Sequence, residues 1–212
     1  MKNLFLIFFL ISLLICHSYS TMAQSVKATE MLNSIEGKYA IDDNGNVTFA
    51  RIVQLVDPET SDTLSKDEIY NRAYSYFVYN YVSGESVIQL SDMPNGIIVA
   101  KGLYPSVHSD VSLIYRNIDA YHILRIDVKK GKARIILSLT QYKYTASDGK
   151  GAPNVSNMII SQTYPFNEKG IFKTFMSKAF VKTYDKAMAT LDALEKAIKE
   201  GNTSKSIENN GW

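Results

Sequence analysis

The sequence predicts an α+β domain with the element order β-α-β-β-β-β-α, in which a mostly antiparallel, curved sheet carries its helices on one face. Three observations predict this class: a hairpin pattern over 121–144, a capped helix that begins at Ser65, and a helical pattern over 172–200. An antiparallel sheet with both helices packed on one side buries such elements economically.

Residues 1–23 are typical of a secretory signal peptide. Lys2 supplies the positive charge, residues 4–16 are almost all apolar, and Thr21 and Ala23 are the small residues expected before a cleavage site. The apolar run is shorter than the roughly 20 residues that span a bilayer, and no later segment of the sequence is long and apolar enough to do so. We therefore expect cleavage after Ala23 and export to the periplasm or cell envelope.

Cys16 is the only cysteine, and it lies within the predicted leader. It is either removed with the leader or lipidated as in bacterial lipoproteins, which the bulky Ile15 before it disfavours. Removal leaves a chain without disulfides, thiol nucleophile or cysteine metal ligands. Lys2 is the only charged residue before Gln24, so of 23 basic and 21 acidic residues, 22 and 21 remain. This balance gives no long-range attraction for nucleic acid or anionic membranes.

The first elements after the leader are a lead-in and a hairpin. A short helix is expected at 29–35. The alternation from residue 39 to residue 56, interrupted by the Asp-Asn-Gly-Asn turn at 43–46, predicts a hairpin.

Ser65 and Glu68 form a capping box: the Ser65 hydroxyl accepts the Glu68 N–H, and the Glu68 carboxylate reaches back. The helix that follows is expected to run to about residue 82, with an apolar stripe. Strands are predicted at 86–91 and 97–104, joined by a Pro-Asn-Gly turn.

Residues 105–118 favour no element. Strands at 121–129 and 133–144 form the clearest hairpin, in which Ala133, Leu137 and Leu139 belong to the buried face. The whole pattern divides the chain into a signal peptide (1–23), a lead-in segment (24–37), a sheet domain (38–145), a loop (146–170), a long C-terminal helix (171–201) and a disordered tail (202–212).

Three stretches carry a family resemblance: SKDEIYNRA at 65–73, GIIVAKG at 96–102 and YHILRIDVKKGKAR at 121–134. Over roughly residues 38–145 the chain resembles an exported bacterial family, mostly from Bacteroidetes, known as domain of unknown function 4468. Its fold is like one half of the TATA-binding protein. The resemblance implies this fold and an exported location. It implies no catalytic residue, because the family has no established activity.

The residue types suggest two catalytic arrangements. Ser106, His108 and Asp110 have the residue types of a hydrolase triad, but they are too close in sequence and no G-x-S-x-G elbow exposes a nucleophile. The alternative function is an envelope hydrolase that uses paired carboxylates, for which the candidates near strand ends are Asp92, Asp110, Asp119 and Asp127. No cofactor is expected.

The sequence predicts no metal site. After the leader only His108 and His122 remain, and His122 shares a strand face with Leu124 and Ile126, which favours a core or edge histidine over a ligand.

Alternation predicts a binding surface on the sheet face turned away from the helices. Its candidate residues are Arg125, Arg134, Tyr142 and Tyr144, residue types that are enriched at binding hot spots. An ordinary solvated sheet face is the alternative. The hairpin tip is basic, with Lys129, Lys130, Lys132 and Arg134. It is interpreted as a solvated tip that discourages edge pairing, with phosphate or glycan contact as the alternative.

The C-terminal helix, about 43 Å long, is expected to extend past strands of about eight residues. It would then expose a seam for self-association or a partner helix, comprising Tyr184, Ala187, Leu191, Leu194 and Ile198. The lead-in segment is the alternative cover.

The sequence therefore favours a noncatalytic cell-envelope binding or assembly module whose partner is an envelope protein or glycan. Nucleic acid is excluded as a partner by the expected compartment and the near-neutral charge.

Overall fold

The computed structural model describes residues 29–30, 32–56, 63–81, 87–111 and 113–201. The elements are β1 (Ala40–Ile41), β2 (Val47–Gln54), α2 (Lys66–Asn80), β3 (Ile88–Asp92), β4 (Ile97–Val111), β5 (Tyr115–Lys129), β6 (Lys132–Ser147), β7 (Asn154–Ile159), the 3-10 turn η1 (Ile160–Gln162) and α4 (Lys173–Glu200). The predicted leader and tail lie outside the described residues.

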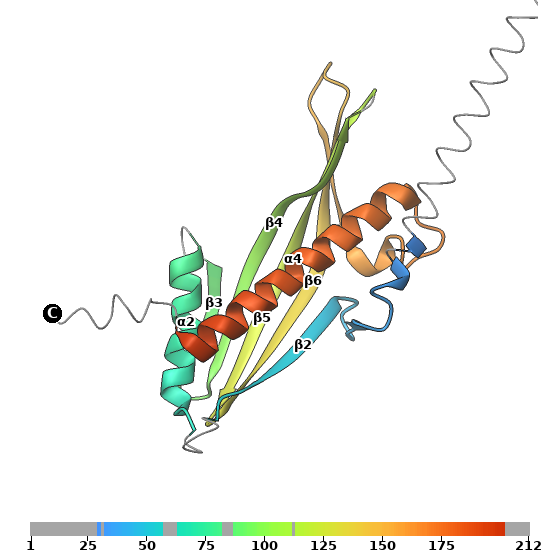
Figure 1. Ribbon diagram of the computed structural model, residues 1–212. Helices are drawn as coiled ribbons and strands as arrows, with labels where there is room; N and C mark the ends of the chain where they lie inside the picture. Colours follow the sequence, from blue (N-terminus) through green and yellow to red (C-terminus); the bar gives the residue numbers. More distant parts are fainter. Residues whose placement is uncertain (1–28, 31, 57–62, 82–86, 112, 202–212) are drawn as a thin grey trace, which may run out of the picture.

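The strands of the described residues form one antiparallel sheet in the order β1-β2-β6-β5-β4-β3, and β7 also pairs with β6. Figure 1 shows α4 lying diagonally across one face of this sheet, with α2 beside its C-terminal end. The predicted α+β class with helices on one face is therefore confirmed.

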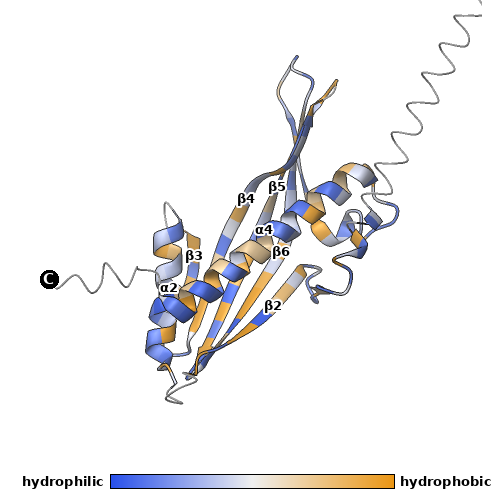
Figure 2. Cartoon of the chain, in the orientation of Figure 1, coloured by the Kyte–Doolittle hydropathy of each residue, from blue (hydrophilic) through white to orange (hydrophobic). Residues whose placement is uncertain are grey.

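The β5–β6 hairpin is the centre of the sheet. Lys129 pairs with Lys132, and Gly131 takes a positive φ of 73° that the tight turn requires. The period-2 pattern appears in Figure 2 as alternating hydrophobic and hydrophilic bands along β2 and β6. One face of these strands is thus apolar and packs under the helices.

Helix α2 begins as half of the predicted capping box. The Glu68 N–H donates to Ser65 Oγ at 3.1 Å, as expected. The Glu68 carboxylate, however, accepts from Arg72 at 2.6 Å, one turn along the helix. Arg72 also donates to the carbonyls of Ile198 and Lys199 and so caps the C-terminus of α4. This residue therefore joins the two helices.

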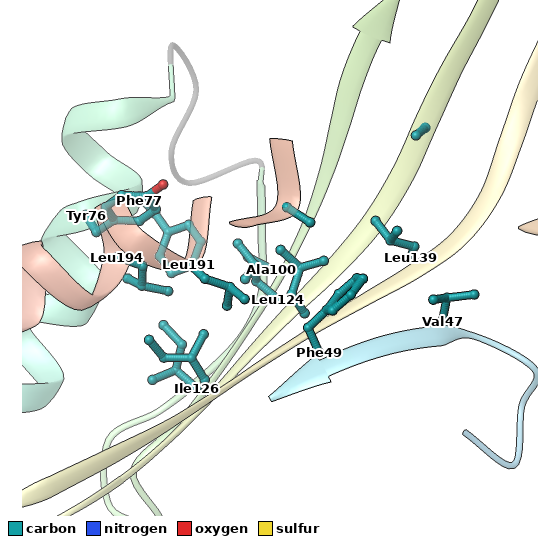
Figure 3. Packing of buried hydrophobic residues seen from close by; sticks show 14 of the residues in the cluster. Val47, Phe49, Tyr76, Phe77, Ala100, Leu124, Ile126, Leu139, Leu191 and Leu194 are labelled. Carbon is teal, nitrogen blue, oxygen red and sulfur yellow. The ribbon is translucent and has the colours of Figure 1, made fainter. Parts of the chain in front are cut away.

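The core lies between the sheet and the two helices, as Figure 3 shows. Phe49 and Leu124 from strands and Leu191 and Leu194 from α4 are all buried there. At the rim of this core, Arg51 of β2 pairs with two carboxylates of α4, Asp192 Oδ1 at 2.5 Å and Glu195 Oε2 at 2.9 Å.

The seam predicted on the C-terminal helix belongs to this core. Ala187, Leu191, Leu194 and Ile198 are buried, and Tyr184 is half-buried. The expectation of an exposed seam is wrong because the strands are twice as long as assumed: the 15 residues of β5 extend about 51 Å, whereas the 28 residues of α4 extend about 42 Å. The sheet and α2 therefore cover the helix along its length.

A bulge in β6 reverses the side-chain alternation. Tyr121 and His122 of β5 pair with Gln141 and Leu139, so Thr140 is an extra residue on β6. Because side chains alternate with period 2, one extra residue moves every later side chain to the other face.

The bulge corrects the predicted positions of two candidate binding residues. Tyr142 is fully buried on the helix side, and the Tyr144 ring lies 6.2 and 6.3 Å from the rings of Phe172 and Phe175. The prediction that Tyr142 and Tyr144 lie on the face away from the helices is therefore wrong.

The far half of the sheet is more extensive than expected. Residues 105–118, left unassigned by the sequence, mostly continue β4 and β5 past an irregularity between Tyr104 and His108, where Ser106 has a φ of 46°. The expected loop 146–170 is corrected in part, because it contains β7. Since β7 is an edge strand whose residues 154–157 are all exposed, it lacks the apolar alternation that identifies a strand.

β2 and β7 lie on the same side of β6, one after the other. β2 pairs with residues 132–139 of β6, and β7 pairs with residues 141–146. The bulge at Thr140 marks the change from one neighbour to the other.

Candidate functional site

We call the sheet face opposite α2 and α4 the open face. Pairing and burial place on it Val99, Lys101 and Leu103 of β4, Tyr121, Ile123, Arg125 and Asp127 of β5, Arg134, Ile136 and Ser138 of β6, and Thr48, Ala50 and Ile52 of β2. Within the described residues, both long helices lie on the other face. Ile52 exposes 63% of its surface, and Leu103 and Leu90 are exposed as well.

Arg125, Asp127 and Arg134 form an ionic cluster on the open face. Arg125 Nε donates to Asp127 Oδ1 at 2.9 Å, and Arg134 donates to Asp127 Oδ2 from Nε at 3.0 Å and from Nη2 at 2.6 Å. Partial burial opposes ionisation of Asp127, but these hydrogen bonds outweigh it and hold its pKa below the ordinary value. The carboxylate thus positions both arginines, which remain exposed.

A shallow hollow of about 260 Å³ lies beside this cluster at the turn end of the sheet. It is lined by Ile52, Gln54, Asp127, Lys129, Lys132, Ala133 and Arg134. The basic hairpin tip predicted from the sequence therefore contributes to the open face, where its cations could hold an anionic group.

The sequence placed two of its four candidate binding residues correctly, Arg125 and Arg134. It missed Asp127 as the residue that positions them, although the alternation of Ile123, Arg125 and Asp127 puts all three on one face. It also missed Ile52, whose exposure depends on the pairing of β2 with β6.

Among the described residues, the hydrogen bonds of Ser106, His108 and Asp110 go to other residues and not to one another. The Ser106 N–H donates to Asp119 Oδ1 at 2.8 Å, and Asp110 accepts two hydrogen bonds from Arg116 at 2.8 and 2.5 Å. His108 Nδ1 lies 3.3 Å from Lys182 Nζ. These contacts describe three separate structural interactions rather than a relay.

Each of the four aspartates proposed for hydrolysis also has its own structural partner. Asp92 accepts from the backbone and side chain of Asn95, and Asp119 accepts from Asn117 as well as from the Ser106 backbone. Asp110 and Asp127 are bound by arginines, as described above. The four residues therefore hold turns and strand pairs in place.

His122 is a core residue, in agreement with the sequence-based interpretation. It is 2% exposed, its ring stacks on Tyr104 with centroids 4.0 Å apart, and neither ring nitrogen has a hydrogen-bond partner among the described residues. Burial lowers the pKa of His122 to about 4. Gly102 makes room for this ring, because a Cβ at that position would overlap it.

The described residues bring together no group of three or more histidine, cysteine, aspartate or glutamate side chains that could hold a metal ion. Within the same residues, the helices are too short or too polar to cross a bilayer.

Residues 60–143, which include α2, β3, β4, β5 and most of β6, match the family model of DUF4468. That family is described as a domain of unknown function with a TBP-like fold. The family resemblance stated from the sequence is therefore confirmed over this segment. No curated protein sequence matches the chain.

Two solved structures are similar to this chain. A DUF4468 family protein from Bacteroides ovatus superposes with a TM-score of 0.55 at 14% identity, over 80% of this chain and 95% of that one. A TBP-like protein from Parabacteroides distasonis gives 0.53 at 14% identity, over 74% and 96%. At this identity the likeness establishes the fold.

Proposed function

We propose that this chain is an exported, noncatalytic module that binds a partner in the cell envelope through its open face. The observation that supports the proposal is the exposure of Ile52, Leu90 and Leu103 on that face. An antiparallel sheet with one solvated face normally carries polar residues there. Here Ile136 and Ile123 lie between Ile52 and Leu103, and such a continuous aliphatic surface marks an interaction site. Export is supported by the tripartite pattern of residues 1–23.

Site-specific photo-crosslinking in the native host tests the binding surface. A photoreactive residue replaces Ile123 in the middle of the open face, and in a control it replaces Lys186 on the exposed side of α4. Defined adducts at residue 123 and none at residue 186 are expected. Equal labelling of both positions, or none at residue 123, would refute the proposal.

The location has a separate test. N-terminal sequencing of protein recovered from the host should begin at Gln24. A retained Met1, or an acylated Cys16 at the new terminus, would contradict cleavage after Ala23.

A further inference from the structure

The open face carries two parallel diagonal rows of side chains, one aliphatic and one cationic. The aliphatic row takes one residue from each of four strands: Ile52 of β2, Ile136 of β6, Ile123 of β5 and Leu103 of β4. Beside it, the cationic row consists of Arg134 of β6, Arg125 of β5 and Lys101 of β4. Both rows follow from the register, because each step moves one strand across the sheet and two residues along it.

The length of the aliphatic row suits one helix. Neighbouring strands lie about 4.8 Å apart, and side chains on one face recur about every 6.8 Å, so each diagonal step is about 8 Å and three steps cover about 25 Å. An α-helix of that length has about 17 residues. α4 already crosses the opposite face on a diagonal (Figure 1), so a partner helix here would complete a second helical layer.

The excess of positive charge on the open face favours a negatively charged partner. The open face and its turn end carry five cations, Lys101, Arg125, Lys129, Lys132 and Arg134, against the carboxylates of Asp92 and Asp127. The chain after residue 23 is almost neutral, so the excess is specific to this surface. Two open faces of identical chains would repel each other, which disfavours self-association here. The aliphatic row in turn favours an apolar polypeptide segment over a purely polar polyanion.

We infer that the partner presents an acidic amphipathic helix to the open face. Its apolar side covers the aliphatic row, and its carboxylates pair with Arg134, Arg125 and Lys101. Asp127 holds two of these cations in position before binding, which reduces the entropy lost on association. This inference rests on the proposed function, which requires only that some partner binds this face.

Titration with a designed peptide tests whether the open face binds an acidic amphipathic helix. The probe is a 17-residue helical peptide with a leucine stripe flanked by glutamates, and the control peptide has lysine at each glutamate position. The protein is isotope-labelled, expressed with its own leader and purified after export. With the glutamate peptide, amide shifts are expected in β2, β4, β5 and β6, with binding weakened by salt. The lysine peptide is expected not to bind.

Variants assign the binding to the two rows. Lys101→Glu reverses one charge without disturbing Asp127 and should weaken peptide binding at least about tenfold, and Ile136→Ser should do the same through the aliphatic row. Lys186→Ala, on the exposed side of α4, should leave the affinity unchanged. Unfolding curves verify that each variant is folded.

Three results would overturn the inference: equal binding of both peptides, shifts confined to α4, or no binding of the glutamate peptide. Polygalacturonate and phosphatidylglycerol vesicles are titrated in parallel. If either binds the open face while the glutamate peptide does not, the partner is a glycan or a lipid surface, and the proposed function stands without the helix. The proposed function itself fails only if the crosslinking experiment fails.

Discussion

The buried His122 predicts a specific loss of stability in mild acid. In the unfolded chain a histidine has a pKa near 6.5, whereas burial lowers that of His122 to about 4 in the fold. Between these values the unfolded state binds a proton that the folded state excludes. The contribution is therefore fully present above pH 6.5 and is lost as the pH falls toward 4.

The magnitude follows from the size of the shift. Each pKa unit corresponds to about 1.4 kcal/mol, so the free energy of unfolding should fall by about 3 kcal/mol across this window because of His122 alone. That is a large fraction of the roughly 5–15 kcal/mol that stabilises a typical domain. Among the described residues, carboxylates with lowered pKa values, such as Asp127 and Glu195, act at lower pH, because an ordinary carboxyl titrates near pH 4.

The assay compares the wild-type protein with its His122→Gln variant. Urea unfolding followed by far-UV circular dichroism is measured at intervals from pH 7.5 to 4.5. Glutamine changes the packing and so shifts the whole curve, but it cannot take up the proton. The free energy of unfolding of the wild type, relative to that of the variant, should therefore fall by up to about 1.4 kcal/mol for each pH unit below pH 6.5. Curves that stay parallel over this range would refute the reasoning from burial.

Three further substitutions test the packing. Gly102→Ala should cost about 1–3 kcal/mol because its methyl group overlaps the His122 ring, and in a His122→Ala background most of this cost should vanish in urea unfolding; an unchanged cost would exclude the contact. Leu194→Ala should cost about 2–5 kcal/mol by opening a cavity, whereas Lys186→Ala on the same helix should change stability by less than about 0.5 kcal/mol; equal effects would mean that the seam is not core. Arg51→Ala should lower the midpoint of thermal unfolding by an amount that corresponds to about 1 kcal/mol, and the loss should shrink in 1 M salt if the pairs with the two carboxylates of α4 are its cause.

Local patterns in the sequence predicted the elements well. The Ser65 cap, the turn at Gly131 and the helix end at Gly201 each depend on a few neighbouring residues, and the structure has all three. Arg125 and Arg134 were assigned to the correct face because the strand alternation is unbroken between the turn and each of them.

Features that depend on distant parts of the chain were harder to predict. The bulge at Thr140 is visible in the sequence, because the spacing of apolar residues changes from two to three between Leu139 and Tyr142. The length of β4 is not visible, because Pro105 and the polar residues after it resemble a loop. The whole error about the helix seam follows from that misread length. Two candidate tyrosines were likewise misplaced by one inserted residue.

The coverage of the edges of β6 and β4 by other strands affects how readily the sheet can aggregate. A long unpaired edge is a template for fibril growth. Among the described residues, β6 offers no such edge, because β2 and β7 cover it in turn. β3 covers β4 only at 97–100, and the remaining edge of β4 is broken by Pro105, which has no N–H to donate, and by the left-handed Ser106. The long strands β4 and β6 therefore offer little continuous edge to a second chain, which lowers their tendency to aggregate at high concentration.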